Sequence, residues 1–147
     1  MTKNPPTLNG SCLCGAVTYR IDGAPLDFVL CHCGRCRKTT GSSFAANLIA
    51  RPADLTWTSG HSTTGGHATT GQPDGVARWD LPTAASFATA TCRVCGTPVP
   101  HATRNGRLMI VPAGTLDCDP GLTPRRQIFT ASKAGWCIDV EDLPAES

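Results

Sequence analysis

The chain has 147 residues, 40% hydrophobic and 16% charged, which suits one globular domain over residues 1–147 and leaves little length for a second core. A formal charge of +2 and an aromatic content of 5% argue against a nucleic-acid-binding surface. No stretch approaches the ~20 apolar residues of a membrane span, and residues 1–9 lack the apolar core of a secretory signal. We therefore expect a cytoplasmic protein without nucleic-acid or membrane partners.

Short apolar runs between turn-forming residues predict an all-β or mainly β fold, because no apolar repeat of 3.6 residues continues long enough to indicate a helix. In the first run Val17, Tyr19 and Ile21 alternate with polar residues, which is the two-residue period of a half-buried strand. In chain order, strands are predicted at residues 16–22, 28–31, 44–49, 55–58, 76–81, 86–91, 107–111 and 127–130.

A polar segment at residues 59–75 separates the fourth and fifth predicted strands. It contains five glycines and no large apolar side chain, which predicts a mobile surface loop. His61 and His67 of this loop are poor candidates for metal ligands, because a flexible segment must be ordered before it can bind an ion.

Nine cysteines, an odd number, favour metal ligation over disulfide pairing in a chain that lacks a secretory signal. Cys118 and Cys137 are isolated, and we expect them to act as small buried hydrophobic residues. The other seven form three clusters, at residues 12–14 (CLC), 31–36 (CHCGRC) and 92–95 (CRVC). Seven bound thiolates and two Zn²⁺ ions would change the formal charge from +2 to −1.

The three clusters differ in what they offer a zinc ion. A C-x-C pair in extended backbone places both side chains on one face, and a C-x-x-C pair followed by Gly96 forms a tight knuckle, so two pairs can supply a closed tetrahedron. The middle cluster offers three thiolates from six residues, which leaves a fourth position for water or substrate. The spacing also permits other partitions, including a Cys₄ site that draws on the middle cluster.

Other interpretations of these residues remain open from the sequence. The C-x-x-C pairs could be redox-active, or both zinc ions could be purely structural. His32 lies between two candidate ligands, either as a hydrogen-bonded strand residue or as a proton donor near the metal. His101, six residues after Cys95, is a candidate fourth ligand that would close the open site.

Five segments, in this order and spacing, resemble the glutathione-dependent formaldehyde-activating enzyme family, which includes centromere protein V. They are GSCLCGAV at 10–17, CHCGRCRK at 31–38 followed by Gly41 and Ser42, CRVCGTP at 92–98, VPAGTLD at 111–117, and IF at 128–129 with SKAGW at 132–136. The sequence departs from the family at Thr91, Gln127 and Gly135, where an aromatic residue, a histidine and a proline are common, and in the length of segment 59–75.

The resemblance implies a β-tent fold of short antiparallel strands with two zinc ions per chain. It implies a structural zinc held by Cys12, Cys14, Cys92 and Cys95. It also implies a catalytic zinc held by Cys31, Cys33 and Cys36.

The resemblance further implies a carbon–sulfur lyase similar to S-(hydroxymethyl)glutathione synthase, with glutathione as co-substrate. Such an enzyme adds glutathione or a related thiol to formaldehyde or a similar small aldehyde, so its partners are small molecules. Arg35, Arg37 and Lys38 are candidates for contacts with the glutathione carboxylates, or else lie on a solvated loop. The alternative is a non-catalytic zinc-binding module for structure or protein interaction, which would have the same cysteines.

Overall fold

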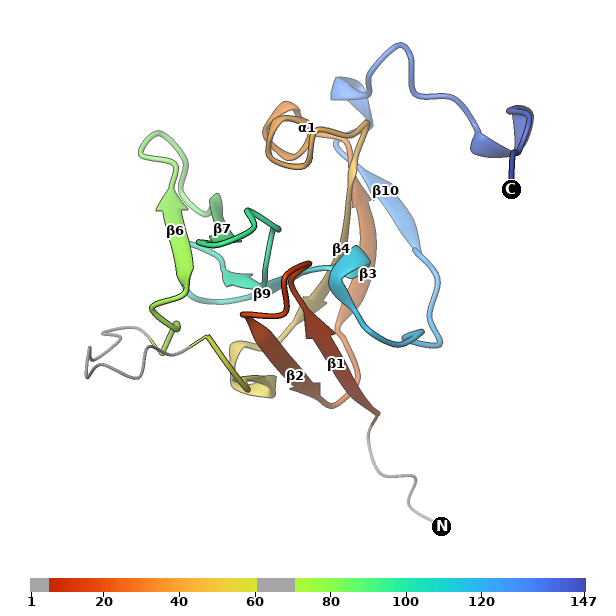
Figure 1. Cartoon of the computed structure of the whole chain (residues 1–147). Coiled ribbons are helices and arrows are strands. Elements are labelled where there is room, and N and C mark those ends of the chain that lie inside the picture. Colours follow the sequence, from red (N-terminus) through yellow and green to blue (C-terminus); the bar gives the residue numbers. More distant parts are fainter. Residues whose placement is uncertain (1–5, 61–70) are drawn as a thin grey trace.

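A computed structural model describes residues 6–60 and 71–147 of the chain, and within these ranges strands predominate and one α-helix is present (Figure 1). The helix is α1 (Gly34–Thr40). The strands are β1 (Thr7–Ser11), β2 (Thr18–Asp22), β3 (Asp27–Cys31), β4 (Ala45–Ala50), β5 (Leu55–Trp57), β6 (Val76–Asp80), β7 (Ala88–Cys92), β8 (His101–Ala102), β9 (Met109–Pro112) and β10 (Arg126–Ile128). Short 3₁₀ turns are η1 (Pro52–Asp54), η2 (Ala113–Thr115), η3 (Thr130–Ser132) and η4 (Val140–Asp142). No helix in the described ranges is long and apolar enough to cross a membrane.

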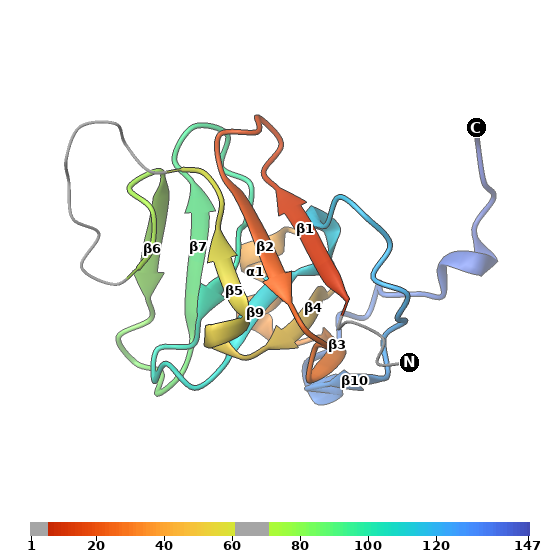
Figure 2. The ribbon, with the colours of Figure 1, turned by 90° about the horizontal axis from the view of Figure 1, so that it is seen from below.

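The strands form three small sheets. One has the order β1-β2-β5, the second has the order β10-β3-β4-β9-β8, and the third is the β6-β7 hairpin. Neighbouring strands are antiparallel except for β10 and β3, which are parallel. Figure 2 shows β6 and β7 to one side of β5, β2 and β1, with β3, β4 and β9 behind them. The expectation of a mainly β fold is confirmed.

The five-stranded sheet has two different faces, because successive side chains of a strand point to opposite sides. Leu48 and Val111 point to one face, where they pack with Tyr19 and Ile21 of the first sheet into the main apolar core. Their neighbours Ile49 and Ile110 point to the other face and line a cavity. The sheet is therefore both the floor of the cavity and one wall of the core.

All eight predicted strands are found, with their boundaries displaced by at most two residues. The sequence interpretation missed β1, the two-residue strand β8, and helix α1. The helix was missed because its seven residues have no buried side chain and therefore no apolar period. Local groups define it instead: Cys33 caps its N-terminus, and Gly41 ends it in the left-handed conformation, at φ 66°.

The ends of the predicted loop at residues 59–75 are packed against the body of the protein. The side chain of Pro73 is fully buried, and the Gly75 N–H donates to the Gly60 carbonyl oxygen at 2.8 Å. Ser59 donates to the Ala16 carbonyl oxygen at 3.1 Å. The central part of this segment, with His61 and His67, lies outside the described residues.

Gly10 on β1 provides a test of how the first sheet packs. It pairs with Tyr19 on β2, and a Cβ added at Gly10 would overlap the Tyr19 ring. The ring is held in place because it is buried and its hydroxyl lies 2.7 Å from Thr115 Oγ1. We expect Gly10→Ala to lower the free energy of unfolding by about 1–3 kcal/mol, as measured by denaturant titration.

The matched control for this substitution is Gly135→Ala, since no atom lies within 4 Å of a Cβ added at Gly135. It should change the free energy of unfolding by no more than ~0.5 kcal/mol. Equal stability of the two variants would contradict the close approach of β1 and the Tyr19 ring.

Candidate functional site

Four of the clustered thiols meet at the end of the β1-β2 and β6-β7 hairpins. Cys12 and Cys14 come from the turn between β1 and β2, whereas Cys92 is the last residue of β7 and Cys95 comes from the turn that follows it. Their sulfur atoms all lie within 4.8 Å of one another, although the pairs are about 80 residues apart. Gly96 has φ 74°, so it takes the left-handed conformation expected for the knuckle.

Backbone and hydroxyl groups point at these sulfur atoms. The Val17 N–H lies 3.3 Å from Cys12 Sγ, and the Val94 N–H lies 3.4 Å from Cys92 Sγ. Thr97 Oγ1 lies 3.1 Å from Cys95 Sγ, a contact that lowers the pKa of the Cys95 thiol to about 5. Donors of this kind stabilise thiolate over thiol, and thiolate is the form that binds metal.

The spacing of these four sulfur atoms fits a zinc ion. A tetrahedron with metal–sulfur bonds of ~2.3 Å has sulfur–sulfur edges of about 3.8 Å. Cys12 Sγ lies 3.6 Å from Cys14 Sγ, and Cys14 Sγ lies 3.8 Å from Cys92 Sγ. Cys12 and Cys92 are also buried among Val17, Val76 and Val99, so an ion here would be joined directly to the second apolar core.

The remaining three clustered cysteines form a separate group where β3 passes into α1. Cys31 is the last residue of β3, Cys33 caps the helix, and Cys36 lies in its first turn. Their sulfur atoms also lie within 4.8 Å of one another. The structure thus brings together the four and the three cysteines as two groups, and no described histidine or carboxylate belongs to either group.

Hydrogen bonds within this group order its thiols. The Cys36 N–H donates to Cys33 Sγ at 3.3 Å, which closes the first turn of the helix. A hydrogen bond with Cys36 lowers the pKa of the Cys31 thiol to about 6, and the same contact raises the pKa of Cys36. Three sulfur atoms converging in this way fit three corners of a zinc tetrahedron.

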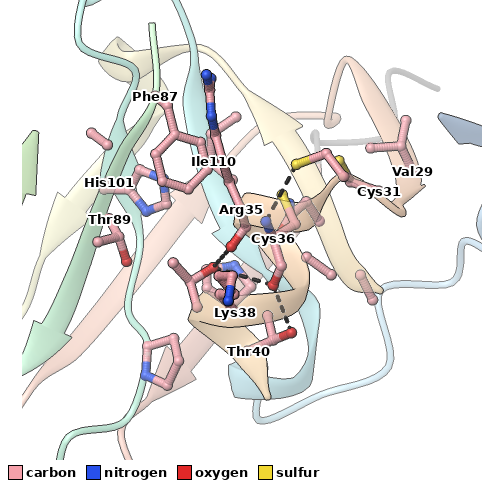
Figure 3. Close-up of a pocket in the computed structure, with 18 of the residues that line it drawn as sticks. Val29, Cys31, Arg35, Cys36, Lys38, Thr40, Phe87, Thr89, His101 and Ile110 are labelled. Atoms are coloured by element: carbon pink, nitrogen blue, oxygen red, sulfur yellow. Dashed lines mark hydrogen bonds between the residues drawn. The ribbon is translucent and has the colours of Figure 1, made fainter. Parts of the chain in front are cut away.

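A cavity of about 950 Å³ opens beside the three-cysteine group. Its floor is the outer face of the five-stranded sheet, and β7 and α1 provide further walls. Figure 3 shows Cys31 and Cys36 on one side of the cavity, with Phe87, Thr89 and His101 opposite. A concave, largely apolar space with a few reactive groups at one wall is the usual form of a small-molecule site.

The three cations near the helix do not act as a set. Arg35 and Lys38 are exposed and line the cavity, with the Arg35 guanidinium 5.7 Å from the centre of the Phe87 ring. Arg37 does not line the cavity, and its Nε is buried without a hydrogen-bond partner. A helical residue and its second neighbour point to different sides of the helix, which explains the division.

His101 lines the cavity without joining the three cysteines. Burial lowers the pKa of its imidazole to about 4, so the ring is neutral at pH 7. Its Nδ1 lies 3.4 Å from the Val99 carbonyl oxygen and donates to it. The suggestion that His101 is the fourth ligand is not supported by the geometry of the cysteine group.

His32 points into the interior of the protein. Its ring is buried, its Nε2 lies 2.8 Å from Gln127 Oε1, and it meets the Phe44 ring edge to face at 5.5 Å. The contacts favour the hydrogen-bonded interpretation of His32 over a role near the metal, although the residue directly follows β3 and is not part of the strand. Gln127, a departure from the family pattern, is the partner in this bond.

Sequence reasoning missed several residues that shape the site. Phe87 and Phe129 both line the cavity, and Thr97 joins the two knuckles because its hydroxyl also accepts from the Leu13 N–H at 3.1 Å. Phe129 has φ 54°, a conformation that is rare for a bulky side chain and often marks a functional site. Thr97 could have been suspected from its place two residues after Cys95.

The expectation that Cys118 and Cys137 are buried is wrong. Cys118 is exposed and Cys137 is half-buried, and both are free thiols. Cys118 follows the η2 turn in a part of the chain that lies at the surface. The course of the chain, and not the apolar character of the cysteine, therefore determines its exposure.

The chain matches the family model described as glutathione-dependent formaldehyde-activating enzyme over residues 7–132. The crystal structure of a Rhodobacter sphaeroides protein is similar, with a TM-score of 0.56 and 23% sequence identity over 81% of this chain and 98% of that one. At this identity the likeness shows a common fold. None of the curated proteins matches the chain.

The four-cysteine group yields a stability prediction. If one ion joins residues so far apart in the sequence, loss of a ligand should uncouple the two hairpins. We expect Cys92→Ser to bind about one zinc fewer per chain and to lose about 4 kcal/mol or more in unfolding free energy.

Zinc content by elemental analysis and thermal melting measure these two effects. The control is Cys118→Ser, which alters an exposed thiol outside both groups and should match the wild type. A Cys92→Ser variant with full zinc content and an unchanged melting temperature would show that Cys92 is not a ligand.

Proposed function

This chain belongs to the glutathione-dependent formaldehyde-activating enzyme family, and on that premise we propose that it is a carbon–sulfur lyase that joins a thiol to a small aldehyde. Glutathione or a related thiol is the nucleophile, and formaldehyde or a similar aldehyde is the acceptor. One carbon–sulfur bond forms, and the thiol proton ends on the former carbonyl oxygen, as in S-(hydroxymethyl)glutathione synthase.

The observation that carries this proposal is the three-cysteine group at the wall of the cavity. Cys31, Cys33 and Cys36 would hold a zinc ion through three protein ligands. A zinc ion with an open fourth position supplies the means to deprotonate a coordinating thiol near neutral pH. The cavity beside these residues would hold the aldehyde close to that position.

Two cations at the cavity suit a thiol that carries carboxylates. Arg35 and Lys38 line the cavity, and glutathione has two carboxylates that such side chains can bind. We do not include Arg37 in the proposed contacts, because it does not line the cavity. The aromatic contact with Phe87 limits the directions in which the Arg35 side chain can point.

The other four cysteines would hold a second, structural zinc, giving two ions per chain. Cys12, Cys14, Cys92 and Cys95 leave no protein position open for substrate. Free thiols in this number suit a reducing compartment, so we propose that the protein works in the cytoplasm on small molecules.

Replacing Cys33 with alanine tests the function. The cysteines of the second group are close in sequence and close only short loops, so their loss should cost less stability than loss of Cys92. We expect Cys33→Ala to remain folded with about one zinc per chain. It should lose the acceleration of adduct formation between glutathione and formaldehyde, measured by NMR exchange with the uncatalysed rate subtracted.

The matched control is Cys118→Ala, which should keep the wild-type rate and zinc content. A wild-type protein that neither accelerates the reaction nor responds to thiol at its second zinc would favour the non-catalytic zinc module. A Cys33→Ala variant that unfolds would mean that both groups are structural.

A further inference from the structure

The cavity is larger than the reaction with formaldehyde requires. Glutathione and formaldehyde together have 22 heavy atoms, which fill roughly 660 Å³ even at the ~30 Å³ that a water molecule occupies in the liquid. The cavity measures about 950 Å³. It would therefore keep space for several more heavy atoms if both molecules were wholly inside it.

The interior surface of this space is mostly apolar, although Asn47, Thr89 and His101 also line it. Ile49, Ile110 and Ile128 line it from three strands of the five-stranded sheet, and Phe87 and Phe129 line it from loops. Ala45 of β4 and Thr89 of β7 are small residues that line the cavity between these larger side chains, whereas Ala46 and Ala90 pack in the two apolar cores. An apolar group that moves from water into this space would contact a surface with few hydrogen-bonding groups, and this transfer is favourable.

The charged groups of the cavity lie at its rim. Arg35 and Lys38 line it with exposed side chains, and no described residue that lines it is acidic. The two carboxylates, the ammonium and the amides of glutathione would be costly to bury against the apolar interior. A thiol of this kind therefore fits the rim, where Arg35 and Lys38 can meet its carboxylates and water can solvate its ammonium. That placement leaves the interior for the second substrate.

We propose that the interior of the cavity takes the apolar body of an aldehyde larger than formaldehyde, with an aliphatic chain of several carbons or an aromatic ring. This inference rests on the proposed function, because it assigns the aldehyde of that same reaction. The aldehyde carbon lies toward Cys31, Cys33 and Cys36, and the apolar body lies along the sheet between Ile110 and Thr89 of β7. The reaction forms the same carbon–sulfur bond with the same proton transfer, and only the aldehyde substituent differs.

Binding of unreactive adduct analogues tests this assignment without catalysis. S-methylglutathione and S-hexylglutathione share the polar thiol part and differ by five methylenes. Each methylene that enters an apolar site raises affinity by about fourfold at most. We expect the zinc-loaded protein to bind S-hexylglutathione at least tenfold more tightly in isothermal titration calorimetry.

A filled cavity should remove this preference. Thr89 is a half-buried residue of β7 that lines the cavity opposite the cysteines (Figure 3), and a phenylalanine there would occupy space in the interior. We expect Thr89→Phe to reduce the affinity ratio of the hexyl over the methyl compound at least threefold. Thr56→Phe makes the same change at an exposed position of β5 outside the cavity and should keep the wild-type ratio.

The kinetic arm compares acetaldehyde with hexanal, whose carbonyl groups react similarly with thiols in water. The acceleration over the uncatalysed rate should be at least tenfold greater for hexanal. If hexanal is preferred and the hexyl analogue binds more tightly, the proposal stands. If the hexyl analogue binds more tightly but no aldehyde is accelerated, the apolar subsite stands and the lyase function falls.

Equal affinities for the methyl and hexyl compounds in the wild-type protein would overturn the proposal. So would a failure of both compounds to bind at millimolar concentration, because the rim would then not hold the glutathione part. If Thr89→Phe does not fold, the relative affinity of the wild-type protein for the methyl and hexyl compounds tests the proposal by itself.

Discussion

Four thiols that lie within 4.8 Å of one another impose the strongest constraint on this fold. If all four ionised without a cation they would repel one another, so the proposed metal ion would make this arrangement favourable. Cys12 and Cys92 of this group are also members of the second apolar core. The proposed ion would therefore fix the β1-β2 turn to the end of β7. Since β7 forms one wall of the cavity, the proposed ion would also help to hold that wall in place.

The second cysteine group depends on different parts of the structure. Cys31 ends a central strand of the five-stranded sheet, and Cys33 and Cys36 belong to the start of a short helix. The opposite walls include residues of β7 and β8, and the proposed ion at the end of β7 would help to fix the first of these walls. This division gives the two proposed ions separate tasks. One holds elements together, and the other offers a position that a small molecule can reach from the cavity.

The sequence predicted those features that depend on the type and spacing of a few residues. It predicted poorly those features that depend on how distant segments pack together. Alternation in residues such as Val17, Tyr19 and Ile21 located β2, and cysteine spacing indicated the two groups that the structure brings together. Helix α1 escaped because its caps, not an apolar stripe, define it. The cavity could not be predicted, because Phe87, Ile110 and Phe129 meet only after three distant segments have folded. Cys118 shows the opposite error, since composition suggested burial and topology placed it on the surface.

The central claim is that one metal site is closed and the other is open to thiols. Cadmium-113 NMR of the metal-exchanged protein measures this directly, because cadmium replaces zinc at thiolate sites and its chemical shift reports the ligands. The account predicts two resonances, of which one stays fixed and one moves when glutathione is added. A single resonance, or two that both ignore the thiol, would contradict it.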